Sequence, residues 1–496
     1  MTPYQTLETR FRRLGTLGEA VAMLQWDSAT QMPEGAAPAR AEQTAALRVI
    51  SHEILTEPDM GELIAGAEAQ NELDAWQRAN VHEMRRRWLH ATAVPPDLVE
   101  ALTKACSSSE MVWRKARPAA DFVAVRPHLE RVLSLVREAG AAKAEKLGVS
   151  PYEALLDEFE PGGTVAAIDA LFDDLAAMLP GLIEGALARQ AKLGPPLPLD
   201  DPFPVEIQRK LGVELMKRLG FDFEHGRLDI SLHPFCGGTP DDVRITTRYD
   251  ETNFTRALMG VLHETGHALY ERGLPVAWRR QPVGDARGMS VHESQSLLME
   301  MQACRSREFL EFAAPLLRAA FGGKGPAWEA DNLYRIYTRV ERGFIRVDAD
   351  EVTYPAHVIL RYRLEKAMIA GDLEVEDLPG EWNQGMRELV GVTPPSDREG
   401  CLQDIHWYDG AWGYFPTYTL GAMTAAQLFA AAKRAVPSIP SAISRGDFSP
   451  LLGWLRANVH GKGSLLPTAE LLRQATGSTL DAKIYEDHLR RRYLGA

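Results

Sequence analysis

The chain has 496 residues, of which 45% are hydrophobic, so it is long enough to bury a large core. Its formal net charge of −13 at pH 7 argues against binding of nucleic acid or anionic lipid through bulk electrostatic attraction.

The N-terminal segment MTPYQTLETRFRRLGTLGEAVAML carries charges throughout and lacks the apolar core of a signal peptide. No run of about 18 uncharged apolar residues indicates a membrane span. The four cysteines are far apart and form no CxxC pair, which is typical of free thiols in a reducing compartment. We therefore expect a cytoplasmic protein with thiols at Cys106, Cys236, Cys304 and Cys401.

Most of the chain has the pattern of helices. Apolar residues recur at helical spacing in the segments 40–55, 127–148 and 164–194, where Ala, Leu, Glu, Arg and Lys dominate. The breaker cluster GPPLPLDDPFP at 194–204 is short and lies between helical patterns. We interpret it as a loop within a single domain.

One segment indicates a strand. In DDVRITTRYDE (241–251), Val243, Ile245 and Thr247 alternate with more polar residues, and β-branched residues at period two favour a strand. The preceding HPFCGGTP (233–240) is rich in turn residues. The sequence thus predicts a mainly α fold with one small sheet just before the motif described next.

The segment 253–273 contains the motif HETGH on a predicted helix. Apolar residues recur at helical spacing, Thr252 or Asn253 can cap the start, and Gly273 suits the end. Gly266 costs about 1 kcal/mol relative to alanine inside a helix. We interpret that cost as a sign that space is needed beside a metal ion.

His263 and His267 are four residues apart, so both imidazoles lie on one helix face and can bind one metal ion. Glu264 is rotated by about 100° from His263 and can reach a bound water from the side. This H-E-x-x-H spacing is a zinc-binding signature. The alternative is a chance pattern on an ordinary surface helix.

A catalytic zinc site needs a third protein ligand and leaves one position open. The metzincin spacing requires Gly and His where this chain has Tyr270 and Gly273, so that class is excluded. A predicted helix at 288–305 offers Glu293 as the third ligand, with His292 as its rival.

The same predicted helix offers a second carboxylate at Glu300, two turns after Glu293. Ser290 and Glu293 have the spacing of a capping box, which would start the helix at Ser290. Glu293 then lies nearer the helix start, and we prefer it as the ligand.

At this point the chain resembles a known family, the carboxypeptidase Taq family of metallocarboxypeptidases. The resemblance covers nearly the whole chain and rests on HETGH together with eight further motifs. These are WDSATQMP (26–33), YEALLDEFEPG (152–162), HPF (233–235), DVRIT (242–246), HESQS (292–296), IRVDAD (345–350), GCLQDIHW (400–407) and GYFPTYTLG (413–421).

The resemblance implies a single saddle-like helical domain with a deep central groove, whose walls would be residues 1–195 and 205–496. It implies release of single amino acids from peptide C-termini with broad specificity, with Zn²⁺ or else Co²⁺ as the cofactor. It also implies a homodimer. We expect no nucleic-acid or membrane partner.

We expect Glu264 to act as the general base toward a metal-bound water and then as the acid toward the leaving amine. Donors to the developing oxyanion are expected in the segment HWYDGAWGYFPTY (406–418), where the alternative for the aromatic side chains is core packing. The candidates are His406, Tyr414 and Tyr418.

An exopeptidase must also bind the substrate's terminal carboxylate, a task that suits arginine. Arg346 is the first candidate, and its alternative role is an internal ion pair with Asp348 or Asp350. Arg244 and Arg248 are rivals, although we expect Arg244 to anchor the sheet to neighbouring carboxylates.

Four further expectations concern the surroundings of the metal. His233 lines the end of the groove or contacts substrate, and its alternative role is structural. The strand 242–248 pairs with an extended peptide or only within its own sheet. Asp350 and Asp404 orient the metal-binding histidines or form surface ion pairs.

Two other functions stay open from the sequence. One is a zinc oligopeptidase that cuts internally or releases dipeptides with the same metal helix. The other is a noncatalytic peptide-binding scaffold, which would be expected to lack Glu264 or a metal ligand.

Overall fold

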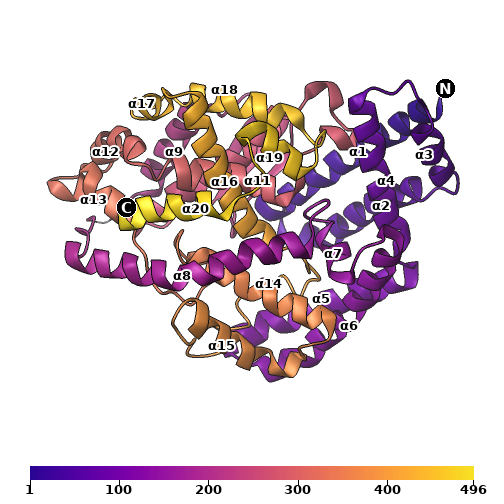
Figure 1. The fold of residues 1–496 in the computed structure, drawn as a ribbon, viewed down its shortest axis with the longest axis horizontal. Coiled ribbons are helices and arrows are strands. Elements are labelled where there is room, and N and C mark those ends of the chain that lie inside the picture. Colours follow the sequence, from indigo (N-terminus) through magenta and orange to yellow (C-terminus); the bar gives the residue numbers. More distant parts are fainter. Residues whose placement is uncertain (201, 496) are drawn as a thin grey trace.

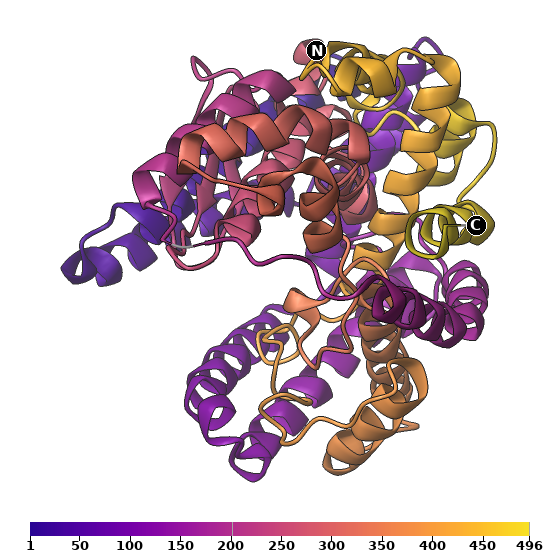
Figure 2. The same cartoon turned by 90° about the vertical axis from the view of Figure 1, so that its left-hand side faces the viewer.

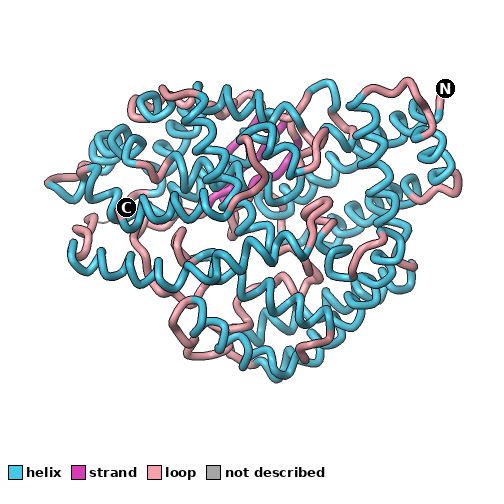
Figure 3. The backbone as a smooth tube through the Cα atoms, viewed as in Figure 1, coloured by secondary structure: helices cyan, strands magenta, loops and turns pink. Residues whose placement is uncertain are grey.

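The computed structural model describes residues 1–200 and 202–495, and nearly all of its regular structure is helical (Figure 3). The only sheet in these residues has three short strands. The predicted class, mainly α with one small sheet before the motif helix, is therefore confirmed. Among the described helices, none combines the length and the apolar character needed to span a membrane.

The helices form two groups, which Figure 2 shows as a lower and an upper part of the molecule. The lower group comprises α5 (Pro96–Ala119), α6 (Phe122–Leu147), α7 (Pro151–Leu156), α8 (Val165–Leu193), α14 (Tyr354–Ala370) and α15 (Leu378–Leu389). The upper group comprises α1 (Pro3–Thr30), α2 (Ala37–Leu55), α3 (Met60–Glu68), α4 (Ala75–Ala93), α9 (Val205–Leu219), α10 (Phe254–Gly273), α11 (Gly288–Leu297), α12 (Arg307–Phe321), α13 (Ala330–Tyr337), α16 (Pro416–Ala435), α17 (Ile439–Ile443), α18 (Ser449–Asn458), α19 (Thr468–Thr476) and α20 (Ala482–Leu489).

The two groups do not divide the chain into halves. In the lower group, α14 and α15 lie beside α8, which comes from far earlier in the sequence (Figure 1). One hydrophobic cluster extends from Ala116 to Tyr493 and includes residues of both groups, which favours a single domain. The groove and its two walls, 1–195 and 205–496, stay predictions.

The three predicted helices of the N-terminal part are present. The segments 40–55, 127–148 and 164–194 lie in α2, α6 and α8. The side chains of Asp121 and Thr164 cap α6 and α8 by accepting hydrogen bonds from backbone amides. The segment 194–204 connects α8 to α9, and all of it except residue 201 is described as non-helical.

The sheet has the order β1-β3-β2, with β1 at Gly226–Ile230, β2 at Cys236–Thr239 and β3 at Asp242–Thr247. β1 runs parallel to β3 and β2 runs antiparallel to it. The strand at 241–251 is thus confirmed, but the turn expected over 233–240 contains β2. The prediction that β3 adds a substrate peptide along its edge is wrong, because both of its sides are already paired.

α10 follows the sheet and begins as predicted. The side chain of Asn253 accepts a hydrogen bond from the Thr255 amide, and the helix ends at Gly273. α11 differs from its prediction, because it begins at Gly288 and continues after Leu297 as a π-helical segment, Leu298–Ala303. Ser290 therefore lies inside α11, and the predicted capping box is wrong.

Candidate metal and catalytic site

The three predicted metal ligands lie together. His263 and His267 extend from α10, Glu293 extends from α11, and one ligand atom of each lies within 4.8 Å of the others. The Glu293 Oε2 atom is 3.4 Å from His267 Nε2 and 3.9 Å from His263 Nε2. Two imidazoles and one carboxylate are a donor set that divalent zinc accepts, with a fourth position left for a small ligand.

Two glycines let the helices come close enough for this arrangement. A Cβ on Gly266 of α10 would lie 2.4 Å from the Gln295 carbonyl oxygen of α11. On the other side, a Cβ on Gly421 of α16 would lie 2.9 Å from the Cβ of Glu293. The space that Gly266 provides is thus filled by the α11 backbone, and the prediction that it lies beside the metal is wrong.

The outer nitrogen of His263 binds a carboxylate. Its Nδ1 lies 2.9 Å from Glu300 Oε2, and Arg305 forms an ion pair with the same carboxylate. A donating Nδ1–H leaves Nε2 as the metal-binding atom, an assignment made from the hydrogen-bond pattern. Glu300, an alternative ligand in the sequence, therefore orients a ligand.

His292, the other alternative ligand, contacts His267 at Nδ1, the ring nitrogen that does not face Glu293. The two Nδ1 atoms are 2.7 Å apart, and His292 Nε2 is 2.7 Å from Glu271 Oε1. If His267 donates through Nδ1–H, His292 accepts and donates in turn to Glu271. This chain of contacts leaves His267 Nε2 free to bind metal.

The charges around His263 fit a bound cation. Burial by itself lowers the pKa of His263, but the hydrogen bond to Glu300 and the charges of Glu293 and Glu264 outweigh it and raise this pKa to about 10. The histidine thus lies among buried carboxylates that need a positive charge nearby. A divalent metal held by His263, His267 and Glu293 would supply that charge.

Glu264 lies beside these ligands and is itself buried. Burial raises the pKa of its carboxyl, the charge of Glu293 adds to the shift, and the result is about 7. A carboxyl with this pKa can both accept and release a proton near neutral pH. The sequence-predicted general base therefore has a suitable pKa for proton transfer.

The three candidate oxyanion donors form one aromatic cluster. His406 Nε2 is 3.2 Å from the Tyr418 hydroxyl, and the Tyr414 and Tyr418 rings are 5.1 Å apart. Burial raises the pKa of Tyr418 to about 12 and also raises that of Tyr414, and the charge of Glu293 contributes to both shifts. Both phenols are therefore protonated donors near the metal ligands.

Arg346 is buried and forms an ion pair, but not with the predicted partners. Its Nε and Nη2 donate to Asp404 Oδ1 at 3.0 and 2.7 Å, and Asp404 Oδ2 accepts from Arg361 at 2.6 Å. The Tyr354 phenol also forms a side-chain hydrogen bond with Arg346. The guanidinium is thus anchored to Asp404 and lies beside Tyr354.

Asp348 and Asp350 bind elsewhere. Asp348 pairs with Arg256 at the surface, and Asp350 accepts hydrogen bonds from the backbone and hydroxyl of Thr353. The prediction that Asp350 and Asp404 orient the metal-binding histidines is therefore wrong. Glu300 and His292 make those contacts instead.

The remaining candidates lie on or beside the sheet. Arg244 binds Asp242 of the same strand through Nε and Nη2, so this ion pair does not anchor the sheet to a carboxylate elsewhere. Its contact outside the sheet is with the Trp26 ring of α1, at 4.2 Å. Arg248 follows the end of β3 and is exposed, and His233 is exposed in the loop between β1 and β2. None of the three contacts the metal ligands within the described residues.

The start of α11 is held by the segment 157–161. The buried Glu160 carboxylate accepts hydrogen bonds from the Ser290 amide at 3.1 Å and from the Thr468 hydroxyl at 3.1 Å. The Met289 amide donates to the Phe159 carbonyl at 2.7 Å. Ser290 is three residues before Glu293, so these contacts fix the helix turn that carries the ligand.

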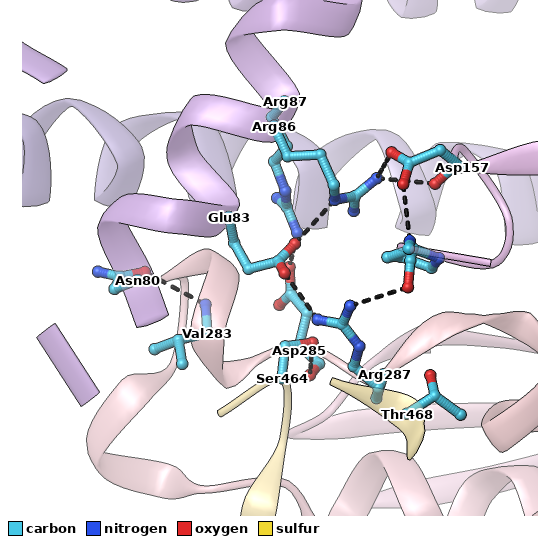
Figure 4. Close-up of polar contacts among 12 residues, drawn as sticks. Asn80, Glu83, Arg86, Arg87, Asp157, Val283, Asp285, Arg287, Ser464 and Thr468 are labelled. Carbon is cyan, nitrogen blue, oxygen red and sulfur yellow. Dashed lines mark hydrogen bonds and ion pairs between the residues drawn. The ribbon is translucent and has the colours of Figure 1, made fainter. Parts of the chain in front are cut away.

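Arg287, directly before α11, extends this network (Figure 4). Its guanidinium forms a buried ion pair with Glu83 of α4 at 2.6 Å. Arg86 of the same helix contacts both Glu83 and Asp157. Helix α4 thereby holds the start of α11 in place through buried ion pairs.

Sequence reasoning missed three residues of the site, Glu160, Glu271 and Tyr354, and it also missed the orienting role of Glu300. Glu300 carried a signal, because it lies two helix turns from Glu293 on the same face. Glu160 lies within a motif of the family, but nothing in its local pattern indicates a partner 130 residues away. Burial raises the pKa of Tyr354, the charge of Glu293 adds to the shift and Arg346 opposes it, which places this phenol among the same groups.

Comparisons with known proteins cover the whole site. A family profile described as carboxypeptidase Taq (M32) metallopeptidase matches residues 6–493. Thermostable carboxypeptidase 1 of Thermus thermophilus is 39% identical, with 99% of each chain covered. Carboxypeptidase 1 of Bacillus subtilis is 35% identical, with 97% of this chain and 96% of the relative covered.

Solved structures give the same relationship. The structure of Trypanosoma cruzi metallocarboxypeptidase 1 matches with a TM-score of 0.97 and 43% identity over 99% of each chain. A structure of Pyrococcus furiosus carboxypeptidase matches with a TM-score of 0.94 and 33% identity, again over 99% of each chain.

The ligand geometry predicts that His267→Ala abolishes stoichiometric metal binding, because two donors cannot hold the ion at ordinary concentrations. Metal content after dialysis, measured by inductively coupled plasma mass spectrometry, checks this. His233→Ala is the matched control, since that histidine is exposed and does not contact the metal ligands in the part of the chain that the structure describes, and it should retain full metal. Equal metal in both variants would contradict the assignment.

Because Glu160 holds the start of α11 through its hydrogen bond with the Ser290 amide, we predict that Glu160→Ala weakens metal binding by about tenfold or more. Without this hydrogen bond, Glu293 loses its fixed position. Glu160→Gln keeps an acceptor for the Ser290 amide and should restore most of the affinity. Competition with a chromophoric chelator measures both. If Glu160→Ala lowers the melting temperature but binds metal as tightly as the original chain, the residue only stabilises the fold.

Proposed function

Because the chain belongs to the carboxypeptidase Taq (M32) family of metallopeptidases and is a metallocarboxypeptidase, we propose that it releases single amino acids from peptide C-termini with broad specificity. We propose Zn²⁺ as its metal, with Co²⁺ as an alternative, held by His263, His267 and Glu293. A homodimer and a cytoplasmic location are part of the same proposal.

One observation carries this proposal: a candidate metal-ligand set, a proton-transfer carboxyl and a buried guanidinium lie in one region of the fold. His263, His267 and Glu293 form the ligand set. Glu264 follows the first ligand directly, and Arg346 lies close enough to the phenols for its guanidinium to stack over Tyr418 at 4.8 Å. A peptide bound between these groups presents its last amide bond to the metal and Glu264, and its terminal carboxylate to Arg346.

When bound, the metal would act as a Lewis acid on the scissile carbonyl and lower the pKa of a water molecule. Glu264 accepts a proton from that attacking water at its carboxylate. It then delivers the proton to the leaving nitrogen, which a carboxyl with a pKa of about 7 can do at neutral pH.

Tyr414 and Tyr418 are proposed to donate hydrogen bonds to the carbonyl oxygen as it becomes negative. Their raised pKa values keep both phenols protonated, as a donor requires. Burial lowers the pKa of His406 to about 4, so at neutral pH it is an uncharged partner of Tyr418. His406 thus orients Tyr418.

Arg346 is proposed to bind the substrate's terminal carboxylate through its guanidinium. Asp404 holds one edge of that group, and Arg361 holds Asp404 in turn. An anchored guanidinium loses little conformational entropy when it binds a carboxylate. This arrangement favours removal of the last residue over internal cleavage, in agreement with the carboxypeptidase names of the relatives.

We predict that Glu264→Gln keeps its metal but loses about 10²- to 10⁴-fold in kcat, because proton transfer is removed. Mass spectrometry of a peptide ladder gives the rate and shows whether residues leave one at a time from the C-terminus. Glu311→Gln, a change at an exposed glutamate of α12, is the control and should keep full activity. Unchanged turnover in Glu264→Gln would remove this residue as the base.

Arg346→Ala is predicted to lose about 10- to 100-fold in kcat/KM on peptides with a free C-terminal carboxylate, because a charged hydrogen bond is lost. Peptides with an amidated C-terminus should be poor substrates for the original chain and little affected by the change. Arg248→Ala is the control. An equal loss on both kinds of peptide would mean that Arg346 has a structural role.

A further inference from the structure

A second set of charged groups lies in a pocket of about 830 Å³ between the end of α8, α13 and the C-terminal segment. Figure 1 shows these elements side by side at the edge of the molecule. No metal ligand, and neither Glu264 nor Arg346, is among the described residues that line it. Its volume falls within the range of small-molecule sites, about 300 to 1,000 Å³.

Arginine dominates the charged lining. Two acidic residues, Asp331 and Glu341, face six arginines, which are Arg189, Arg307, Arg335, Arg339, Arg342 and Arg492. The whole chain carries a net charge of −13, whereas the charged residues that line this pocket are mostly positive. The local field therefore attracts anions that the rest of the surface repels.

Four of these arginines are neutralised by carboxylates. Arg307 pairs with Asp331, Arg339 with Glu341, Arg342 with Glu184 and Arg492 with Glu351.

The other two arginines bind backbone carbonyl oxygens. Arg189 donates to those of Arg492 and Tyr493, and Arg335 donates to those of Leu193, Gly194 and Pro195. Neither has a carboxylate partner within the part of the chain that the structure describes. Among the described residues, two positive charges at this pocket thus have backbone carbonyl oxygens as partners and no carboxylate.

A second pocket of about 250 Å³ adjoins the first and shares Arg307, Tyr334 and Arg492 with it. It adds Lys433 and Arg491, for which the described residues offer no ion-pair partner, and one acidic residue, Glu308. Tyr334 lies where the two pockets meet, with the Arg307 guanidinium 4.4 Å above its ring. The excess positive charge therefore extends through both pockets.

We propose that the joined pockets bind a small organic anion that carries at least two phosphate or carboxylate groups and an apolar or aromatic body. Guanidinium groups bind both kinds of anion through paired hydrogen bonds, which explains the excess of arginine over lysine. Tyr334 and the apolar wall from Leu187 and Leu193 provide contact area for the body of the ligand. This site is separate from the catalytic cluster, so its existence does not depend on the proposed mechanism.

Isothermal titration calorimetry of the metal-loaded protein tests the proposal. Adenosine 3′,5′-bisphosphate is the phosphate probe, benzene-1,3,5-tricarboxylate is the carboxylate probe, and adenosine is the uncharged control. We expect at least one anion to bind with a Kd below roughly 1 mM, more weakly as salt is added, and adenosine not to bind. The probe that binds more tightly identifies the anionic group.

Arg335→Gln removes one of these charges while keeping a donor for the carbonyl oxygens, and it should raise the Kd by about tenfold. Arg491→Gln, at an exposed position, tests the second pocket without risk to the fold. Arg363→Gln is the control, because that arginine is exposed, pairs with Asp173 and lies outside both pockets. The proposal is overturned if neither anion binds, or if both pocket variants bind as tightly as the control.

Discussion

The candidate metal site depends on the close contact between α10 and α11 at Gly266. A single methyl group there would lie 2.4 Å from the backbone oxygen of Gln295, so any larger residue would separate the two helices. Gly421 of α16 provides the same closeness on the opposite side of α11. The contact between the helix backbones therefore sets how far the two imidazoles lie from the carboxylate. Side-chain rotamers then make only small changes to these distances.

Around these helices the fold buries several charged side chains that have partners of opposite charge. Glu300 is bound by Arg305, Glu83 by Arg287, and Asp404 by two arginines. Because a buried charge without a partner is costly, each pair also restricts where its helix can lie. The electrostatic contacts that neutralise the site thereby also position it.

Features of the fold and the candidate site that depend on residues close together in the sequence could be predicted, whereas those that depend on residues far apart in the sequence could not. Local periodicity and the four-residue histidine spacing predicted α10 and both imidazoles, and ligand chemistry indicated Glu293. The start of α11 was predicted wrongly because the acceptor for the Ser290 amide is Glu160, 130 residues away. Likewise, the partner of Arg346 is Asp404 instead of the nearby Asp348 or Asp350, since tertiary packing and not sequence proximity chooses ion-pair partners. β2 was missed because Cys236–Thr239 is short and glycine-rich, and it becomes a strand only by pairing with β3.

The bracing of α11 by Glu160 and Thr468 has a consequence for the order of events during synthesis. A nascent chain carries His263, His267 and Glu293 long before its ribosome has translated Thr468. The hydroxyl of Thr468 donates the second hydrogen bond to the Glu160 carboxylate. Contacts of such high sequence separation form late in folding. The Glu160 carboxylate therefore gains its second donor only once Thr468, in the last tenth of the polypeptide, has been translated, and a product truncated before Thr468 retains every candidate ligand but lacks that hydrogen bond.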